Sequence, residues 1–154
     1  MVLFDLPAVV PGAEARFASA GVRGRVEIVP GSFRDDPLPQ GADAISLVRV
    51  LYDHADSTVA QLLRAVHAAL PAGGRVIVSE PMSGGDAPDP ATDVYFSVYT
   101  LAMQTGRTRS GAEIQRLLEN AGFADCRSHR GFRPFVTSVV TGVKPVNPSA
   151  QKSV

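Results

Sequence analysis

Cysteine is almost absent from this sequence, which excludes two kinds of stabilising site. Cys126 is the single cysteine, so the chain can form neither an internal disulfide nor a cysteine-rich zinc site. The histidines His67 and His129 show no ligand-like spacing, and we predict that no metal is bound. The shortage of cysteine suits a reducing cytoplasm.

Charge and long apolar runs are also scarce. Charged residues make up 19% of the chain, and its 15 basic and 15 acidic residues are scattered, so we expect no nucleic-acid partner. No apolar run approaches the roughly 20 residues of a membrane-spanning helix, and the N-terminus lacks a signal-peptide pattern. With 154 residues, the chain has the length of one compact domain, and we expect a cytoplasmic location from its single cysteine.

Apolar patterns predict strands and helices in alternation. Strands are expected at residues 2–5, 25–29, 42–50, 75–80, 124–130 and 135–143. Helices are expected at residues 8–20, 56–70, 92–104 and 110–121, with a loop at 81–90 and a frayed tail from 145. We expect the last two strands to form an antiparallel pair at one sheet edge. This order predicts an α/β fold with a mostly parallel sheet.

Local signals mark where two of these helices begin. The run Asp56-Ser57-Thr58 offers N-caps for the second helix, and Ser110 with Glu113 has the spacing of a capping box. Arg107 and Arg109 stand just ahead of that box. We interpret this pair as solvated side chains or as helix caps.

Polar residues follow the ends of successive predicted strands. They are Asp5, Gly31-Ser32-Phe33, the segment from Arg49 to His54, and Glu80. Because ligands of parallel α/β sheets bind at the carboxyl ends of the strands, this pattern predicts a cofactor cleft. Asp5 has the position of an acid that accepts hydrogen bonds from a ribose diol, although a loop carboxylate or a helix cap would look the same.

A phosphate-binding glycine loop is not expected in this chain. No glycine-rich loop precedes Asp5, and Gly73-Gly74 stands before a strand instead of a helix. Gly73-Gly74 is therefore interpreted as a turn.

The segment Tyr52-Asp53-His54-Ala55-Asp56 concentrates ionisable groups just after an apolar strand. His54 has the chemistry of a general base, because an imidazole exchanges a proton near neutral pH. Tyr52 would act as a base only when ionised, or otherwise as a hydrogen-bond donor. A polar loop that caps the next helix explains the same residues, so both interpretations stay open.

Five blocks in order give the chain a family resemblance. They are Phe4-Asp5-Leu6-Pro7, Gly31-Ser32-Phe33, Arg49-Val50-Leu51-Tyr52-Asp53, Pro71-Ala72-Gly73-Gly74-Arg75 and Thr105-Gly106-Arg107-Thr108-Arg109-Ser110. With them, nearly the whole chain resembles the S-adenosylmethionine-dependent O-methyltransferases that include plant caffeate and hydroxyindole enzymes. The resemblance implies a Rossmann-like class I methyltransferase sheet, truncated at its N-terminal strand, with residues 1–144 as a partial catalytic domain.

The resemblance also implies which residues bind S-adenosyl-L-methionine. Asp5 is expected to hold the ribose hydroxyls, Gly31-Ser32-Phe33 to line the adenine pocket, and Arg49 to lie beside the cofactor. The expected cofactor-binding residues are Asp5, Leu6, Gly31, Ser32, Phe33 and Arg49. Relatives often carry an aspartate where this chain has Ser32, which can still form a hydrogen bond but has no charge.

The catalytic residues implied by the resemblance depart from the plant pattern. Relatives that methylate phenols carry a histidine base where this chain has Tyr52, followed here by Asp53 and then His54. His54 is expected to supply the base instead. Glu80 resembles the acid that orients the base, whereas a second acid is replaced by Thr108. The expected catalytic residues are Tyr52, Asp53, His54 and Glu80.

Further blocks resemble a bacterial branch of the family that methylates a tertiary hydroxyl of carotenoids. They are Tyr52-Asp53-His54, the segment from Ser79 to Gly85, and Asp93-Val94-Tyr95-Phe96. A long hydrophobic substrate would suit an apolar pocket built from Tyr95, Phe96, Tyr99, Leu101 and Met103. Ordinary helix core is the alternative interpretation of those side chains.

The resemblance implies that parts of the full-length enzyme are missing here. Relatives begin with a helical domain that dimerises and covers the substrate, followed by a strand and a Gly-x-Gly-x-Gly loop. We therefore expect a homodimer for the full-length enzyme, and weak or no binding of S-adenosylmethionine by this chain alone. The competing hypotheses are an inactive truncated methyltransferase fragment and a nicotinamide-dependent Rossmann oxidoreductase.

Overall fold

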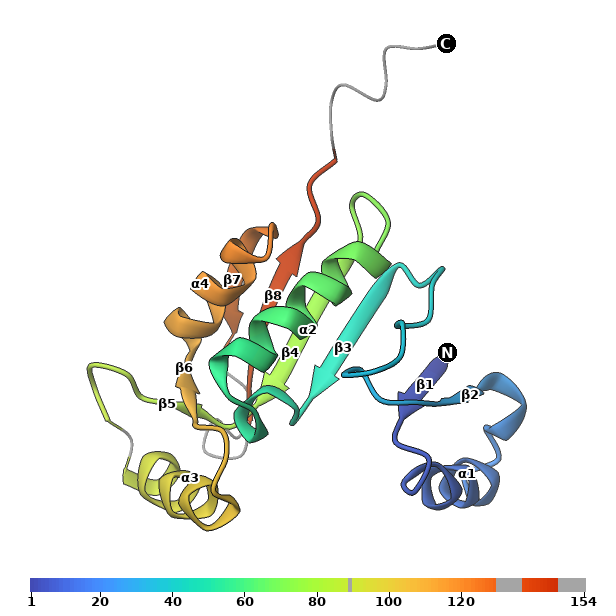
Figure 1. The fold of residues 1–154 in the computed structure, drawn as a ribbon, viewed down its shortest axis with the longest axis horizontal. Helices are drawn as coiled ribbons and strands as arrows, with labels where there is room; N and C mark the ends of the chain where they lie inside the picture. Colours follow the sequence, from blue (N-terminus) through green and yellow to red (C-terminus); the bar gives the residue numbers. More distant parts are fainter. Residues whose placement is uncertain (89, 130–136, 147–154) are drawn as a thin grey trace. The chain divides into compact units, whose positions relative to one another are not determined.

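The computed structural model describes residues 1–88, 90–129 and 137–146, which form two compact units divided after Gln40 (Figure 1). Each unit has its own sheet, and the predicted α/β pattern of strands joined by helices is confirmed in both. Of the predicted C-terminal elements, residues 130, 135–136 and 147–154 lie outside the described residues.

The first unit is a single crossover of two parallel strands. Strand β1 (Val2–Asp5) pairs with β2 (Glu27–Pro30), and α1 (Val10–Ser19) connects them, with a proline in its first turn as expected. Strand β2 begins later than predicted because Arg23–Arg25 forms a short 3-10 helix, η1. The register places Asp5 opposite Pro30, so the residues that follow both strands lie at the same end of this sheet.

The second unit contains a four-stranded sheet in the order β3-β4-β8-β7. Its strands are β3 (Ala44–Val48), β4 (Arg75–Glu80), β7 (Ala124–His129) and β8 (Ser138–Val143). Strands β3 and β4 are parallel, whereas β8 is antiparallel to both of its neighbours. The predicted antiparallel pair at one sheet edge is therefore confirmed.

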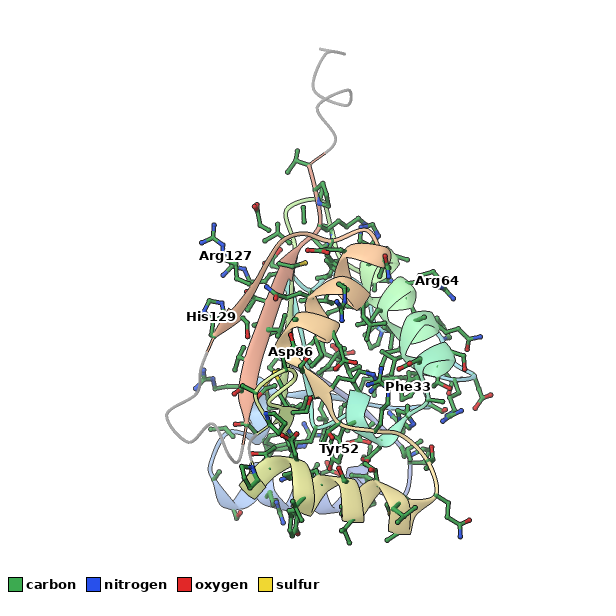
Figure 2. All side chains as sticks on the ribbon, turned by 90° about the vertical axis from the view of Figure 1, so that its left-hand side faces the viewer. Phe33, Tyr52, Arg64, Asp86, Arg127 and His129 are labelled. Carbon is green, nitrogen blue, oxygen red and sulfur yellow. The ribbon has the colours of Figure 1, made fainter. Side chains whose placement is uncertain are left out.

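Two amphipathic helices cover one face of this sheet, as Figures 1 and 2 show: α2 (Asp56–Ala69) and α4 (Gly111–Asn120). The core between them and the sheet consists of fully buried aliphatic side chains, namely Val59, Leu63, Val66, Val76, Val78, Ile114, Leu118 and Val140. The capping box of Ser110 and Glu113 is confirmed. The predicted cap of α2 is wrong, because Ala55 is the N-cap and Asp56 forms an ion pair with an arginine instead.

The remaining elements lie where β3 and β4 end. Helix α3 (Pro90–Met103) contacts the two-residue strand β5 (Met82–Ser83), which pairs with β6 (Arg109–Ser110). The prediction that residues 81–90 form only a loop is therefore wrong, because Met82–Ser83 pairs as a strand. This pairing brings the residues ahead of α4 next to the end of β4. Among the described residues, no helix is long and apolar enough to cross a membrane.

Candidate functional site

A tight turn follows β3 and carries three of the predicted catalytic residues. Residues Leu51–Asp53 form a 3-10 helix, η2, and His54 after it is extended. Arg49 lies between β3 and this turn and has a φ of 56°. This left-handed conformation costs a non-glycine residue roughly 1–2 kcal/mol. The N–H of Arg49 donates to the carbonyl of Ser79 at 2.8 Å and so continues the β3–β4 pairing. Below, residues 51–54 are called the Leu51–His54 turn.

Glu80, at the end of β4, supports this turn from beneath. Its side chain is fully buried, and Oε2 accepts a hydrogen bond from the N–H of Leu51 at 2.9 Å. Burial raises the pKa of Glu80 to about 7, against the opposing effects of the Leu51 N–H and the charge of Arg109. Among the described residues, Oε1 accepts no hydrogen bond. The structure thus places the predicted acid against the backbone of the turn.

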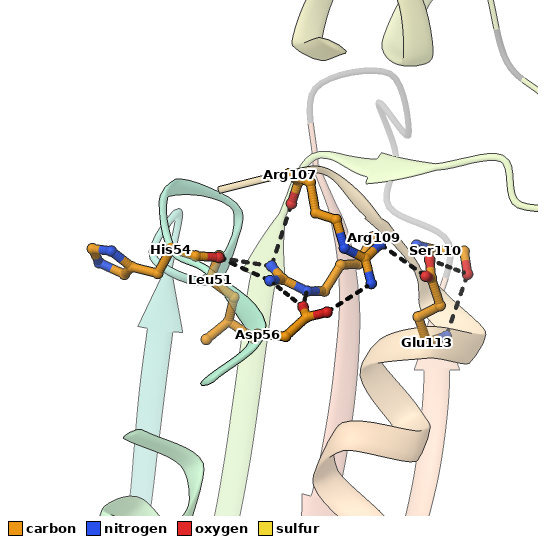
Figure 3. A network of polar contacts seen from close by, with 7 residues as sticks. All are labelled: Leu51, His54, Asp56, Arg107, Arg109, Ser110 and Glu113. Atoms are coloured by element: carbon orange, nitrogen blue, oxygen red, sulfur yellow. Dashed lines mark hydrogen bonds and ion pairs between the residues drawn. The ribbon is translucent and has the colours of Figure 1, made fainter. Parts of the chain in front are cut away.

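Arg109 lies on the other side of the turn and is fully buried. Figure 3 shows its guanidinium donating to the carbonyls of Leu51 and His54, each at 2.8 Å. The same group donates to Asp56 at 2.6 and 2.9 Å, and these hydrogen bonds lower the pKa of Asp56. The interpretation of Arg109 as a solvated or helix-capping side chain is therefore wrong.

Arg107, two residues earlier, behaves as the sequence suggested. Its side chain is 48% exposed and pairs with Asp56 at 3.3 Å and with Glu113 at 2.8 Å. Exposed pairs of this kind contribute about 0–1 kcal/mol. Two arginines in one short loop thus have different environments, and only tertiary contacts distinguish them.

The backbone of the same loop touches the turn directly. Gly106 has a φ of +77°, and a Cβ atom there would lie 2.6 Å from the carbonyl carbon of Asp53 and 2.8 Å from the nitrogen of His54. It would be closer still to the carbonyl oxygen of Tyr52. Thr105 Oγ1 donates to the carbonyl of Asp53 at 3.2 Å. Only glycine satisfies both the conformation and the close approach at this position.

The Tyr52 side chain packs into an aromatic cluster with α3. It is 4% exposed, and its ring centroid lies 5.9 Å from that of Phe96 and 5.7 Å from that of Tyr99. The Arg49 guanidinium donates to the Tyr52 hydroxyl at 3.4 Å and lies over the rings of Tyr52 and Phe96. Tyr52 is thus part of a packed wall.

The apolar residues predicted as a substrate pocket on α3 divide into two groups. Phe96 is buried in the aromatic cluster, whereas Tyr95 is 65% and Leu101 is 78% exposed. An open groove of about 530 Å³ lies beside this helix, lined by Pro90, Val94, Tyr95, Val98, Tyr99 and Ala102. The interpretation as ordinary helix core is therefore correct for Phe96, but not for the exposed side chains.

Asp53 and His54 occupy the outer end of the turn. Burial raises the pKa of Asp53, and its Oδ1 atom is buried without a hydrogen-bond partner among the described residues. His54 is half-buried, and Figure 3 shows its imidazole projecting from the turn on the side away from Arg109. Among the residues that the structure describes, no three His, Cys, Asp or Glu side chains gather as metal ligands.

The predicted cofactor residues of the first unit lie together after β1 and β2. Asp5 is half-buried, and its Oδ1 atom accepts a hydrogen bond from the N–H of Leu6 at 2.8 Å. Its carbonyl accepts from the N–H of Gly31 at 2.8 Å. Across the described residues, the second carboxylate oxygen of Asp5 has no hydrogen-bond donor. That oxygen is available to a ribose hydroxyl, so Asp5 fits the group that the sequence suggested.

The chain turns sharply after Gly31. A Cβ atom at Gly31 would lie 2.5 Å from the ring of Phe4, so the backbone of this residue is in close contact with β1. The N–H of Ser32 donates to Asp36 at 2.9 Å, and its hydroxyl accepts from the N–H of Arg34 at 3.2 Å. Ser32 therefore shapes the turn that presents the residues after β2.

Comparison with known proteins identifies the family of the chain. The pattern that defines the O-methyltransferase domain matches residues 1–124. The chain belongs to the O-methyltransferase family. The family resemblance of the sequence blocks is thereby confirmed.

Two similar relatives are demethylspheroidene O-methyltransferases. The protein from Cereibacter sphaeroides is 58% identical over 145 residues, which are 94% of this chain and 38% of the relative. The protein from Rhodobacter capsulatus is 58% identical over 140 residues, which are 91% of this chain and 34% of the relative. The chain therefore spans less than half the length of the curated relatives that it matches.

A solved structure shares the fold. Human N-acetylserotonin methyltransferase, determined in complex with S-adenosylmethionine, superposes with a TM-score of 0.79 at 28% identity. The match covers 94% of this chain and 40% of the human protein. The predicted class I methyltransferase fold is therefore confirmed.

Proposed function

We propose that this chain is part of an S-adenosyl-L-methionine-dependent O-methyltransferase that methylates a hydroxyl of a carotenoid resembling demethylspheroidene. The observation that carries the proposal is the 58% identity to two demethylspheroidene O-methyltransferases over more than nine-tenths of the chain. The Leu51–His54 turn, which carries an imidazole at one end and the aromatic cluster residue Tyr52, supports it chemically.

For cofactor binding, we assign separate tasks to residues of the two units. In the first unit, Asp5 accepts hydrogen bonds from the ribose hydroxyls, Leu6 adjoins it, and Gly31-Ser32-Phe33 contacts the adenine. The free Asp5 oxygen and the close-packed Gly31 backbone support these roles. In the second unit, Arg49 lies beside the cofactor, held by its contact with Tyr52.

For the chemical step, we assign the base to His54. When bound, the cofactor supplies an electrophilic methyl group on a sulfonium sulfur that leaves as a neutral thioether. In this role, the imidazole of His54 would take the proton of the substrate hydroxyl as the substrate oxygen becomes methylated. Asp53 lies next to this imidazole in the chain, and Glu80 positions the turn. Tyr52 forms a wall of the site, so the step depends largely on orientation.

The substrate class fits the surface of α3. The open groove beside Tyr95 and Tyr99 is lined mainly by apolar side chains, which suits a hydrophobic polyene better than a polar metabolite.

We propose that the full-length enzyme is a homodimer. The single cysteine is in keeping with a cytoplasmic location.

The proposal is tested in a version of the protein extended to the length of its relatives. We expect methyl transfer to a hydroxylated acyclic carotenoid, and thermal protection by S-adenosylhomocysteine but not by NAD. His54→Ala should lower the rate by about 100-fold because it removes the base. Tyr52→Phe should retain at least a tenth of the rate, because the ring is preserved.

The matched control is His129→Ala, since His129 lies on β7 and contacts Thr141. Its activity should equal that of the wild type. Full turnover by the His54→Ala variant would show that His54 is not the base. Thermal protection by NAD alone would favour a nicotinamide-dependent oxidoreductase. Absence of any methyl transfer would favour an inactive fragment. Without the extension, we expect the chain to bind S-adenosylmethionine weakly or not at all in isothermal titration.

A further inference from the structure

We propose that Arg109 is a positioning residue, which sets the orientation of the His54 imidazole by holding the backbone of the Leu51–His54 turn. This inference rests on the proposed function, in which His54 accepts the substrate proton. Arg109 lies more than fifty residues after the turn in the sequence. It belongs to the block Thr105–Ser110, and the family resemblance assigned it no role in the reaction.

The hydrogen bonds of Arg109 join both ends of the turn. One terminal nitrogen, Nη1, donates to the carbonyl of Leu51, and the other, Nη2, donates to the carbonyl of His54, both at 2.8 Å. A guanidinium is planar and rigid, so the two bonds set the distance between these carbonyls as well as their direction. The carbonyl oxygen of His54 is two bonds from the Cα atom that bears its side chain.

Two carboxylates accompany the buried positive charge of Arg109. Asp56 accepts hydrogen bonds from its Nε and Nη2 atoms, and Glu80, whose carboxylate holds the Leu51 N–H, feels its charge. Asp56 lies in the first turn of α2, so the guanidinium also ties the Leu51–His54 turn to the start of that helix. Moving this buried charge outward would break its hydrogen bonds to Asp56 and to both carbonyls, and among the described residues the carbonyl of Leu51 would keep only the N–H of His54 as a donor.

Gly106 provides an independent observation. Its backbone lies so close to the turn that a single methyl group would contact three consecutive residues, Tyr52 to His54. Together with the Thr105 hydrogen bond to Asp53, this contact shows that the loop from Thr105 to Arg109 is fitted to the turn along its length. The loop therefore works as a clamp on a segment more than fifty residues earlier.

The geometry explains why the clamp matters for chemistry. The guanidinium holds one side of the turn, and the imidazole of His54 projects from the other (Figure 3). A shift of the backbone would move the imidazole with it, and a misplacement of about 1 Å can lower a rate by about 100-fold.

The matched variants are Arg109→Lys and Arg107→Lys, which make the same change in the same loop. Both keep the positive charge, and only the first removes a buried fork that binds the turn. Amide hydrogen exchange is measured on the chain itself, and kcat and KM are measured on the extended protein. We expect Arg109→Lys to accelerate exchange of the Asp53 and His54 amides by about tenfold while the β4 amides keep their protection.

In the kinetic assay, Arg109→Lys should lower kcat by about 100-fold and change KM for the cofactor by less than about threefold. Arg107→Lys should change neither quantity. The proposal is overturned if Arg109→Lys leaves exchange and kcat at wild-type values, or if exchange rises equally in β4, which would indicate a purely structural role. If the wild-type protein transfers no methyl group, the proposed function fails, and the exchange data alone decide whether Arg109 holds the turn.

Discussion

Candidate site residues follow two pairs of parallel strands, β1 with β2 and β3 with β4. These two strand ends, one in each sheet, are built in opposite ways. After β1 and β2, the backbone itself makes most of the contacts, and the Asp5 carboxylate keeps one oxygen available. After β3 and β4, fully buried charged groups, Glu80 and Arg109, bind the backbone of the turn. The first arrangement leaves a carboxylate oxygen without a partner among the described residues, whereas the second uses polar atoms to shape the protein.

This difference shows that a charged residue near a site need not touch the ligand. Arg109 and Glu80 have their polar atoms directed at Leu51 and its neighbours, where burial makes each hydrogen bond hard to replace. Asp5 is only half-buried and has an unused acceptor, so its replacement removes little from the fold. Substitutions at the two strand ends should therefore separate stability from ligand binding.

The largest expected effect comes from removing the buried charge. Arg109→Met should lower the free energy of unfolding by about 3–5 kcal/mol, because it removes the hydrogen bonds of a fully buried guanidinium to Asp56 and to the carbonyls of Leu51 and His54. Asp5→Asn, at the other strand end, should cost at most about 1 kcal/mol. Urea unfolding followed by circular dichroism measures both. Equal losses would mean that the two strand ends are not built differently.

The next effect is a pH dependence that only the second strand end should show. Burial raises the pKa of Glu80 from 4.5 to about 7, so between these values the folded protein holds a proton that the unfolded chain releases. The free energy of unfolding should therefore fall by about 3 kcal/mol as the pH rises through this range. The stabilisation by Glu80 is fully present below pH about 4.5 and is lost as the pH rises to about 7.

The control for this titration is Glu80→Gln, which cannot ionise. The difference in stability between the variant and the wild type should change across the pH range from 4.5 to 7.5 and stay constant outside it. A constant difference throughout would show that Glu80 titrates normally. Asp5→Asn is not expected to produce such a window.

The smallest effect contrasts two close-packed glycines. Gly106→Ala should cost about 2–3 kcal/mol, since the methyl group meets backbone atoms and the positive φ adds strain. Gly31→Ala meets the ring of Phe4, a side chain that can shift, and should cost about 1 kcal/mol less. The shift in the urea midpoint reports both values. A larger cost at Gly31 would reverse the proposed contrast.

Much of the fold could be predicted from local patterns. Strand β4 has its predicted bounds, Arg75–Glu80, because an apolar run between a glycine turn and a proline has few other interpretations. The capping box at Ser110 was equally predictable from the sequence, because both partners lie within one helical turn. The cap of α2 was predicted incorrectly, since Asp56 fits an N-cap by type but has a distant arginine as its partner.

The site was only partly predictable for the same reason. Tyr52, Asp53, His54 and Glu80 were expected at strand ends, and the structure places all four at or beside one turn. Arg109 was missed because an arginine in a polar loop usually points to solvent. Two signals pointed to it: Gly106, three residues earlier, and the block Thr105–Ser110 that contains both residues.

By itself, the sequence determined which segments become strands and helices, because side-chain periodicity and capping act over a few residues. It also determined the family, through blocks whose order spans the chain. Only the tertiary structure decided which of two arginines is buried, because Arg109 finds its partners at Leu51, His54 and Asp56 more than fifty residues away. Burial of a charge depends on such distant partners, and no local pattern records them.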